Sequence, residues 1–353
     1  MMQIVSLLLS FVLSYLATPF AIKFATRFGL VDDPSVRAHP ANTHTEVTPR
    51  AGGIPIFVAI LITSFVAIAV NKLLAGILLG GALTVLIGIL DDHYDLSPYL
   101  RFFLNFLVVG FVILFGLGTP YVNNPFGGII RLDTVVWQIN FFGIHQFLPL
   151  ANLFSLIWIV ALMNFVNWSK GVDGQLPGFV AVSSFFLGVL AYRFSGHSIS
   201  AGDTALFSFI IAGAFLGFLP YNFFPQKIMP GYSGGSLAGF LLGVLSILSW
   251  GKFGTLILVL SIPLVDAVYV IVRRLSAGKS PFRGDALHFH HRLLEIGWGK
   301  RRIAVFYWGV SFLFGASSLF LQGFEKILAG SIVFIGLAFF ILIMNRIKLE
   351  HRN

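Results

Sequence analysis

Two adjacent carboxylates, Asp91 and Asp92, follow an apolar stretch of the chain. Ionisation of two neighbouring carboxylates costs free energy, because they repel each other, unless a cation or a proton from the substrate offsets that repulsion. The pair therefore suits a general base or a Mg²⁺ site that faces a phosphate. A solvated acidic cluster at a helix end is the alternative interpretation.

A second polar stretch, residues 164–174, contains Asn164 and Asn167 three positions apart, then Lys170 and Asp173. The two asparagines share one face if this segment is helical. Two glycines in the same stretch allow the backbone to approach a ligand closely. Polar turns between helices are common, so only the density of Asn, Lys and Asp favours a binding site here.

A third stretch, residues 220–236, contains Asn222, Tyr232 and several glycines. Glycine-rich turns that lead into a helix can bind anions through backbone N–H groups. Glycines also recur every four residues from 231 to 243, which equally predicts close helix packing. Both interpretations stay open, with Gly239 and Gly243 assigned to packing.

A fourth stretch, residues 273–302, has eight Lys or Arg and two acidic residues. Asp285, His288 and His291 are spaced at intervals of three, so a transition-metal site is conceivable. The excess of basic side chains repels cations and attracts phosphate, and anion recognition is therefore favoured.

One acidic residue, Asp266, falls inside an apolar segment, where a charge is expensive unless it is paired. Arg273, seven residues further on and on the same helix face, is a candidate partner or at least a screen for this charge.

The composition indicates the kind of fold that holds these residues in place. Of the 353 residues, 57% are hydrophobic and only 10% are charged, which excludes an ordinary soluble globular domain. We predict one all-α, polytopic transmembrane domain over residues 1–353, with its N-terminus outside and its C-terminus cytoplasmic. The apolar stretch 4–20 is predicted to be a retained first span and not a signal peptide. About eleven spans are expected, at 3–27, 53–70, 74–90, 101–118, 150–164, 175–194, 204–220, 234–249, 254–272, 303–322 and 327–345.

The formal net charge of +9 has a topological explanation. In the predicted orientation 18 of the 23 Lys and Arg fall on the inward side, as the positive-inside rule requires. No nucleic-acid partner is needed to explain the charge. The inward loops are 28–52, 91–100, 165–174, 221–233 and 273–302, and the outward loop 119–149 has an alternating pattern that predicts one small β-hairpin. The chain has no cysteine, which excludes disulfides, thiolate nucleophiles and Cys-based zinc sites.

The order of these motifs resembles the polyprenyl-phosphate N-acetylhexosamine-1-phosphate transferases, or glycosyltransferase family 4. The resemblance covers nearly the whole chain, and His-x-His-His at 288–291 is similar to the WecA/TagO-like branch that starts O-antigen, enterobacterial common antigen or teichoic acid synthesis. The residues that carry it are Arg37, His39, Arg50, Asp91, Asp92, Asn164, Asn167, Asp173, Asn222, Pro225, Asp266, Asp285, His288, His290 and His291.

The resemblance implies transfer of a HexNAc-1-phosphate, such as GlcNAc-1-phosphate, from a UDP-sugar to undecaprenyl or another polyprenyl phosphate. UMP would be released, Mg²⁺ would be the cofactor, and a cell-envelope glycan would begin on the cytoplasmic face of the plasma membrane. The family pattern also allows a homodimer. It implies Asp91, Asp92, Asp173 and His290 as catalytic residues and Asn167 and Asp92 as metal ligands. Arg37, His39, Arg50, Asn164, Asn167, Lys170, Asn222, Tyr232, Lys279, Arg283, Asp285, His288 and His291 would bind substrate.

Two residues depart from the family pattern. Lys170 replaces the first aspartate of an Asp-Gly-x-x-Asp-Gly loop, and Tyr232 stands where the principal Mg²⁺ carboxylate is expected. Tyrosine is a poor Mg²⁺ ligand at neutral pH. One hypothesis is that Lys170 replaces part of the metal's charge in an active transferase. The other is that the chain binds a nucleotide-sugar or lipid phosphate without turnover.

Overall fold

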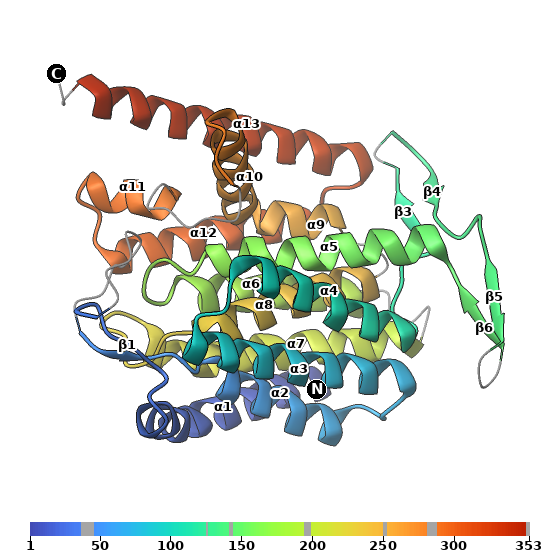
Figure 1. The fold of residues 1–353 in the computed structure, drawn as a ribbon. Helices are drawn as coiled ribbons and strands as arrows, with labels where there is room; N and C mark the ends of the chain where they lie inside the picture. Colours follow the sequence, from blue (N-terminus) through green and yellow to red (C-terminus); the bar gives the residue numbers. More distant parts are fainter. Residues whose placement is uncertain are drawn as a thin grey trace.

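The fold is built almost entirely from helices, as a computed structural model of the chain shows (Figure 1). Residues 1–36, 46–124, 126–140, 144–193, 199–249, 253–280 and 288–350 are described. The helices are α1 (Met2–Arg27), α2 (Gly53–Ala67), α3 (Lys72–Tyr94), α4 (Pro98–Leu114), α5 (Pro149–Trp168), α6 (Gln175–Arg193), α7 (Ile199–Asn222), α8 (Gly231–Leu248), α9 (Phe253–Val259), α10 (Ser261–Ser276), α11 (Phe289–Glu295), α12 (Lys300–Ser318) and α13 (Gly323–Glu350).

The chain is a polytopic, all-α membrane protein. Seven of the described helices are long and apolar enough to cross a membrane, or up to eight if a bent pair forms one span. The bent pair is α9 and α10, which meet at 83° inside the ninth predicted span. Helices α2 and α4 are apolar but shorter, and α12 begins with three basic residues. Each predicted span contains a helix, but the count of eleven stays a prediction.

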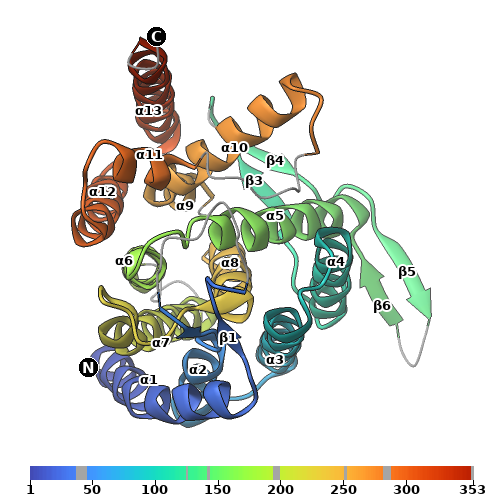
Figure 2. The ribbon, with the colours of Figure 1, turned by 60° about the vertical axis from the view of Figure 1, so that its left-hand side comes forward.

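Helix α8 forms the centre of the bundle and is buried along nearly its whole length. In Figure 2 it lies between α5 on one side and α7 and α2 on the other. Its glycine stripe faces α5: a Cβ on Gly239 would lie 2.5 Å from Met163 Cα, and Gly243 packs against Ile159 in the same way. The predicted packing role of these two glycines is confirmed.

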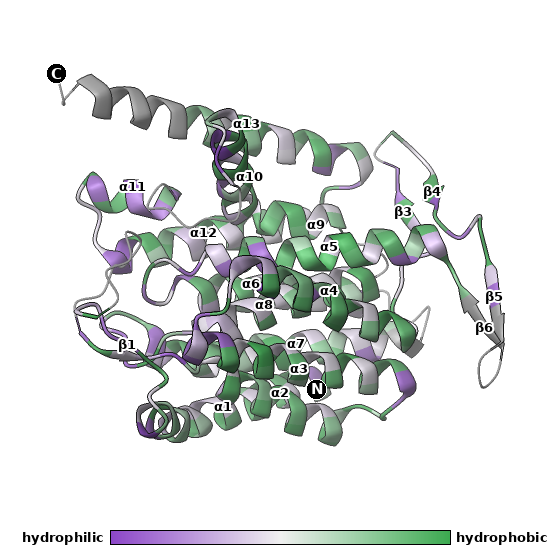
Figure 3. Cartoon of the chain, viewed as in Figure 1, coloured by the Kyte–Doolittle hydropathy of each residue, from purple (hydrophilic) through white to green (hydrophobic). Residues whose placement is uncertain are grey.

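The crossing of α3 and α8 positions the paired carboxylates. Gly88, one turn before Asp91, lies so close to α8 that a Cβ there would be 2.5 Å from the backbone N of Ser233. The carboxyl end of α3 therefore meets the amino end of α8, where Tyr232 is the second helical residue. Hydrophilic residues gather mainly at helix ends, including the side that carries β1 and α11 (Figure 3).

Segment 119–149 forms two hairpins, whereas the sequence predicted one. Strand β3 (Tyr121–Asn123) pairs with β4 (Ile129–Arg131), and β5 (Trp137–Asn140) pairs with β6 (Ile144–Phe147). A further two-residue pair joins β1 (Val31–Asp32) to β2 (Thr48–Pro49) in the loop between α1 and α2. Arg50 continues this loop with a parallel bridge to Met229, which brings it beside the start of α8.

Candidate active site

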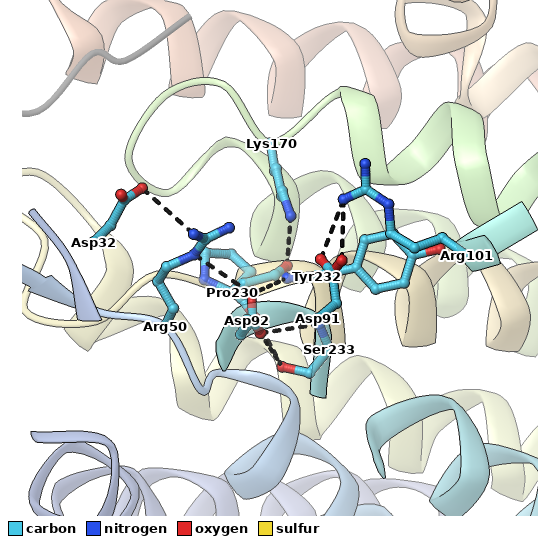
Figure 4. A network of polar contacts seen from close by, with 10 residues as sticks. Asp32, Arg50, Asp91, Asp92, Arg101, Lys170, Pro230, Tyr232 and Ser233 are labelled. Atoms are coloured by element: carbon cyan, nitrogen blue, oxygen red, sulfur yellow. Dashed lines mark hydrogen bonds and ion pairs between the residues drawn. The ribbon is translucent and has the colours of Figure 1, made fainter. Parts of the chain in front are cut away.

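The carboxylates at the end of α3 are buried and fully engaged (Figure 4). Arg101, from the first turn of α4, places Nη1 3.3 and 3.2 Å from the two carboxylate oxygens of Asp91. Arg50 Nε lies 3.4 Å from Asp92 Oδ1, and Arg50 Nη1 lies 3.9 Å from Asp32 Oδ2. Basic residues from two separate segments thus neutralise the adjacent pair.

Asp92 also caps the amino end of α8. The Tyr232 backbone N–H donates to its Oδ1 at 2.8 Å, and the Ser233 hydroxyl donates to its Oδ2 at 3.2 Å. A helix amino end carries unpaired N–H groups and a partial positive charge, which a carboxylate satisfies. The glycine-rich turn therefore does hold an anion, but the anion is a carboxylate of the protein itself.

Lys170 and Tyr232, the two departures from the family pattern, lie in this same cluster (Figure 4). The Lys170 Nζ donates to the Gly231 carbonyl at 2.6 Å and lies 5.9 Å from the centre of the Tyr232 ring. Arg101 contacts the same ring, with its Cζ 5.2 Å from the centre. The Tyr232 hydroxyl accepts a hydrogen bond from Asn105 Nδ2 at 3.1 Å. Position 232 therefore supplies an aromatic face and no charge.

Burial lowers the pKa of Lys170 to about 8. The Asp92 carboxylate opposes this shift and Arg50 adds to it. Since about 8 is still above neutral pH, the Lys170 ammonium keeps its charge at pH 7.

The loop that carries Lys170 also contacts the other predicted motifs. Gly171 packs directly against the imidazole of His290. Asp173 Oδ1 pairs with Lys300 Nζ at 3.1 Å, and the Gly174 N–H donates to Asn222 Oδ1 at 3.0 Å. Two other stretches identified in the sequence, 220–236 and 273–302, thus converge on residues 170–174.

Asp173 and Asn222 are engaged by protein groups in this arrangement. Asp173 Oδ2 accepts from the Gln226 N–H at 3.3 Å, and Asn222 Nδ2 donates to the Ile228 carbonyl at 2.9 Å. These contacts fix the loop between α7 and α8. The catalytic role of Asp173 and the substrate-binding role of Asn222 stay predictions.

Asp266 is paired with a histidine and not with the expected arginine. His288 Nδ1 lies 2.9 Å from Asp266 Oδ2, and the Phe289 N–H donates to Asp266 Oδ1 at 2.8 Å. Arg273 is exposed, so the prediction that it partners Asp266 was wrong. Helical spacing within α10 could not show that a residue 22 positions away returns to this carboxylate.

The three histidines form a row behind the Lys170 loop. The rings of His288 and His290 stack with centres 5.7 Å apart, and those of His290 and His291 are 4.3 Å apart. Burial, and then the neighbouring His291 and His288, hold the pKa of His290 well below its ordinary value. His290 is therefore neutral at pH 7.

Of the remaining predicted residues, three have described surroundings and four lie outside the described residues. Asn164 is half-buried and donates to the Val160 carbonyl of its own helix at 2.8 Å, while Lys279 is exposed. Asn167 is buried against Gly235, and its Oδ1 has no hydrogen-bond partner among the described residues. Arg37, His39, Arg283 and Asp285 lie outside the described residues.

Asp91 and Asp92 offer no unengaged oxygen to a Mg²⁺ ion, and of the predicted metal ligands only Asn167 has an oxygen, Oδ1, that lacks a partner among the described residues. Mg²⁺ requires near-octahedral oxygen ligands, and the oxygens of both carboxylates already accept from N–H or O–H donors or pair with cations. Within the described parts of the chain, no three His, Asp or Glu side chains are grouped to hold a metal ion. The transition-metal hypothesis for His288 and His291 depended on Asp285, which is not described.

Sequence comparisons decide the family. The profile of glycosyl transferase family 4 matches residues 74–250. The chain belongs to glycosyl transferase family 4. It is accordingly a membrane-bound transferase, and the matched segment includes Asp91, Asp92, Lys170 and Tyr232.

Three relatives of this transferase illustrate the similarity. The probable undecaprenyl-phosphate N-acetylglucosaminyl 1-phosphate transferase of Bacillus subtilis is 28% identical over 95% of this chain and 89% of its own length. The decaprenyl-phosphate N-acetylglucosaminephosphotransferase of Mycobacterium tuberculosis is 30% identical over 91% of this chain and 84% of its own length. The undecaprenyl-phosphate alpha-N-acetylglucosaminyl 1-phosphate transferase of Yersinia pestis is 29% identical over 81% of this chain and 75% of its own length.

Several members of the cluster were not recognised from the sequence. Arg101, Asn105 and Ser233 all contact its carboxylates or Tyr232. A signal for Arg101 was present: Ser97 and Pro98 predict a helix start, and only three residues, 95–97, connect that helix to the end of α3, which carries Asp91. No local signal indicates the Lys300 partner of Asp173, since 127 residues separate them.

Proposed function

We propose that this enzyme transfers a HexNAc-1-phosphate, GlcNAc-1-phosphate in the simplest case, from a UDP-sugar to a polyprenyl phosphate. Relatives named for transfer to undecaprenyl or decaprenyl phosphate support the acceptor and the sugar. The observation that carries the proposal is the cluster of Arg50, Arg101 and Lys170 around two carboxylates at the end of a membrane-spanning helix.

The reaction is an exchange of one phosphoanhydride bond for another. An oxygen of the polyprenyl phosphate attacks the β-phosphorus of the UDP-sugar and forms the new P–O bond. The bond between that phosphorus and the bridging oxygen breaks, and the bridging oxygen leaves with UMP. Catalysis then depends on positioning the two phosphates and on neutralising charge. The three basic side chains provide fixed cations for both tasks.

The surroundings of the cluster suit a lipid acceptor. Leu90, directly before Asp91, is 41% exposed, and Phe103 and Leu107, on the helix that carries Arg101, are more than half exposed. Exposed apolar side chains on the apolar helices of a membrane protein face lipid, so a polyprenyl tail can lie along α3 and α4 while its phosphate meets the cations. We place this site on the cytoplasmic face of the plasma membrane, at the first step of a cell-envelope glycan.

The test is an assay of purified enzyme in detergent with UDP-GlcNAc and undecaprenyl phosphate. We expect stoichiometric UMP and a lipid-linked diphosphate sugar, identified by mass spectrometry, with UDP-GalNAc as the alternative donor. Arg101→Met is expected to lower turnover by about 100-fold, because one preorganised charge contributes on that order. The control Arg131→Met, which changes an exposed hairpin arginine, should leave turnover unchanged. Binding of UDP-GlcNAc without UMP release would contradict the proposal.

A further inference from the structure

We propose that the Lys170 ammonium is a built-in cation that takes the place of a divalent metal ion in phosphoryl transfer. This inference rests on the proposed function, because it concerns how the same site neutralises its phosphates. It commits the enzyme to turnover without Mg²⁺.

Lys170 is positioned to act on a phosphate. Its Nζ is directed into the cluster, where one hydrogen bond to the Gly231 carbonyl holds it at 2.6 Å (Figure 4). An ammonium has three donors, so the remaining two can bind phosphate oxygens. The centre of the Tyr232 ring lies 5.9 Å from Nζ and attracts the cation without neutralising its charge. A carboxylate at this position would neutralise that charge.

The charges around Lys170 balance without a metal ion. Three carboxylates, Asp32, Asp91 and Asp92, face three cations, Arg50, Arg101 and Lys170. Coordination of Mg²⁺ by Asp91 would require its oxygens to leave Arg101, and coordination by Asp92 would uncap α8. The Lys170 ammonium, whose charge acts on both carboxylates, would also repel a divalent ion held by either of them.

The two replaced positions form one unit in this scheme. A carboxylate at 232 beside an ammonium at 170 would make an ion pair and consume the charge that the phosphates need. Tyr232 avoids that pairing, and its hydroxyl is held by Asn105. Restoring acidic residues at both positions removes the ammonium and adds two oxygen ligands, so it should create a site for a divalent ion.

The first experiment compares turnover and metal binding in EDTA-treated enzyme. UMP release is measured with excess EDTA and then with added Mg²⁺, and binding of Mn²⁺ is followed by the loss of its free electron paramagnetic resonance signal. We expect the wild type to keep more than half of its turnover in EDTA and to bind no Mn²⁺ at this site. Turnover that EDTA abolishes and Mg²⁺ restores would overturn the inference.

Variants at position 170 distinguish a role of the ammonium charge from a purely structural role of the Lys170 side chain. Lys170→Met should lower turnover by on the order of 100-fold, Lys170→Arg should retain more of it, and the control Lys72→Met, at the opposite end of α3, should match the wild type. The double variant Lys170→Asp with Tyr232→Asp should bind one Mn²⁺ per chain and require a metal for turnover. Equal turnover of Lys170→Met and the control would overturn the inference.

Failure of the proposed function has a different signature. If no UMP is released under any condition, the transfer reaction is wrong for these substrates, and the metal measurement still decides the cation inference. Absence of Mn²⁺ binding in the wild type, with binding in the double variant, supports it. Mn²⁺ binding by the wild type that Asp91→Asn abolishes overturns it.

Discussion

Lys170 and Tyr232 are altered together relative to the family pattern, and they touch. The ammonium of Lys170 lies over the Tyr232 ring and bonds to the residue directly before it in the chain. A change at one position alone would leave either an ammonium paired with a carboxylate, which is neutral as a pair, or a carboxylate beside a tyrosine, which carries a negative charge. The observed pair, an ammonium beside a neutral aromatic ring, carries one positive charge at the proposed phosphate site.

The charge of Lys170 is sensitive to pH just above neutrality. Burial lowers its pKa to about 8, so the ammonium loses its proton as the pH rises through that value. We expect kcat/KM to fall above pH 8 in the wild type. Lys170→Arg should remove this decrease, because a guanidinium stays charged throughout that range. Among the described residues, the charged and titratable groups facing Lys170 are Arg50, Asp91, Asp92, Arg101 and Tyr232.

The measurement is a pH profile of UMP release from pH 6.5 to 10 for the wild type, Lys170→Arg and the control Lys72→Arg. The control should reproduce the wild-type profile, since Lys72 is exposed at the far end of α3. A decrease near pH 8 that persists in Lys170→Arg would assign the titration to another group.

At the scale of elements, the short helix α11 depends on one carboxylate for its position. It has seven residues, too few for an independently stable helix. Asp266, on α10, accepts the Phe289 N–H and contacts His288 at the start of α11. We expect Asp266→Ala to lower the free energy of unfolding by about 1–3 kcal/mol, because two buried donors or acceptors lose their partner. Asp266→Asn should lower the free energy of unfolding by less, because its amide oxygen can still accept the Phe289 N–H.

The effect of Asp266→Ala is measured as thermal unfolding in detergent, together with proteolysis of the segment 288–302. Faster cleavage there is expected before any global unfolding. The control Asp133→Ala breaks an exposed hairpin ion pair and should change neither quantity. Equal behaviour of the two alanine variants would contradict the anchoring role.

The contact between α5 and α8 provides a second element-scale prediction. A Cβ on Gly239 would meet backbone atoms of Leu162 and Met163, which cannot move aside as a side chain could. We expect Gly239→Ala to destabilise the protein by about 1–3 kcal/mol. Gly309→Ala, at a helical glycine with nothing within 4 Å, should be neutral or slightly stabilising because alanine favours helices. The two variants are compared by thermal unfolding under the same condition. A loss of stability in Gly239→Ala that is smaller than the loss in Gly309→Ala would contradict the prediction.

At the scale of the whole molecule, the sequence predicted helix positions well because an apolar stretch of membrane-spanning length has few alternatives. The sequence did not predict features that depend on contacts between residues far apart in the chain. The average hydropathy of 254–272 conceals the 83° bend between α9 and α10. The partner of Asp266 is 22 residues away, and that of Asp173 is 127 away. Site residues were recognised by type and motif, but the pairing of Lys170 with Gly231 and Tyr232 required the packing of α5 against α8.

The predicted orientation of the chain can be tested because it has no cysteine of its own. Helix α3 has 23 residues, a length of about 35 Å at 1.5 Å per residue, which exceeds a hydrocarbon core of about 30 Å. Its first residue, Lys72, and the cluster at its other end should therefore lie on opposite sides of the membrane. Exposed Lys227, in the loop before α8, lies on the side of the cluster.

Single variants Lys72→Cys and Lys227→Cys each introduce one thiol, which a membrane-impermeant maleimide labels only from the side that it can reach. With the N-terminus outside, Lys72→Cys should be labelled in intact cells, and Lys227→Cys only after the cells are permeabilised. The wild type provides the unlabelled control. The reverse pattern would place the cluster of Asp91, Asp92 and their basic partners outside the cell, where the positive-inside rule does not favour its three cations. Labelling of both thiols in intact cells would show instead that α3 does not separate them across the membrane.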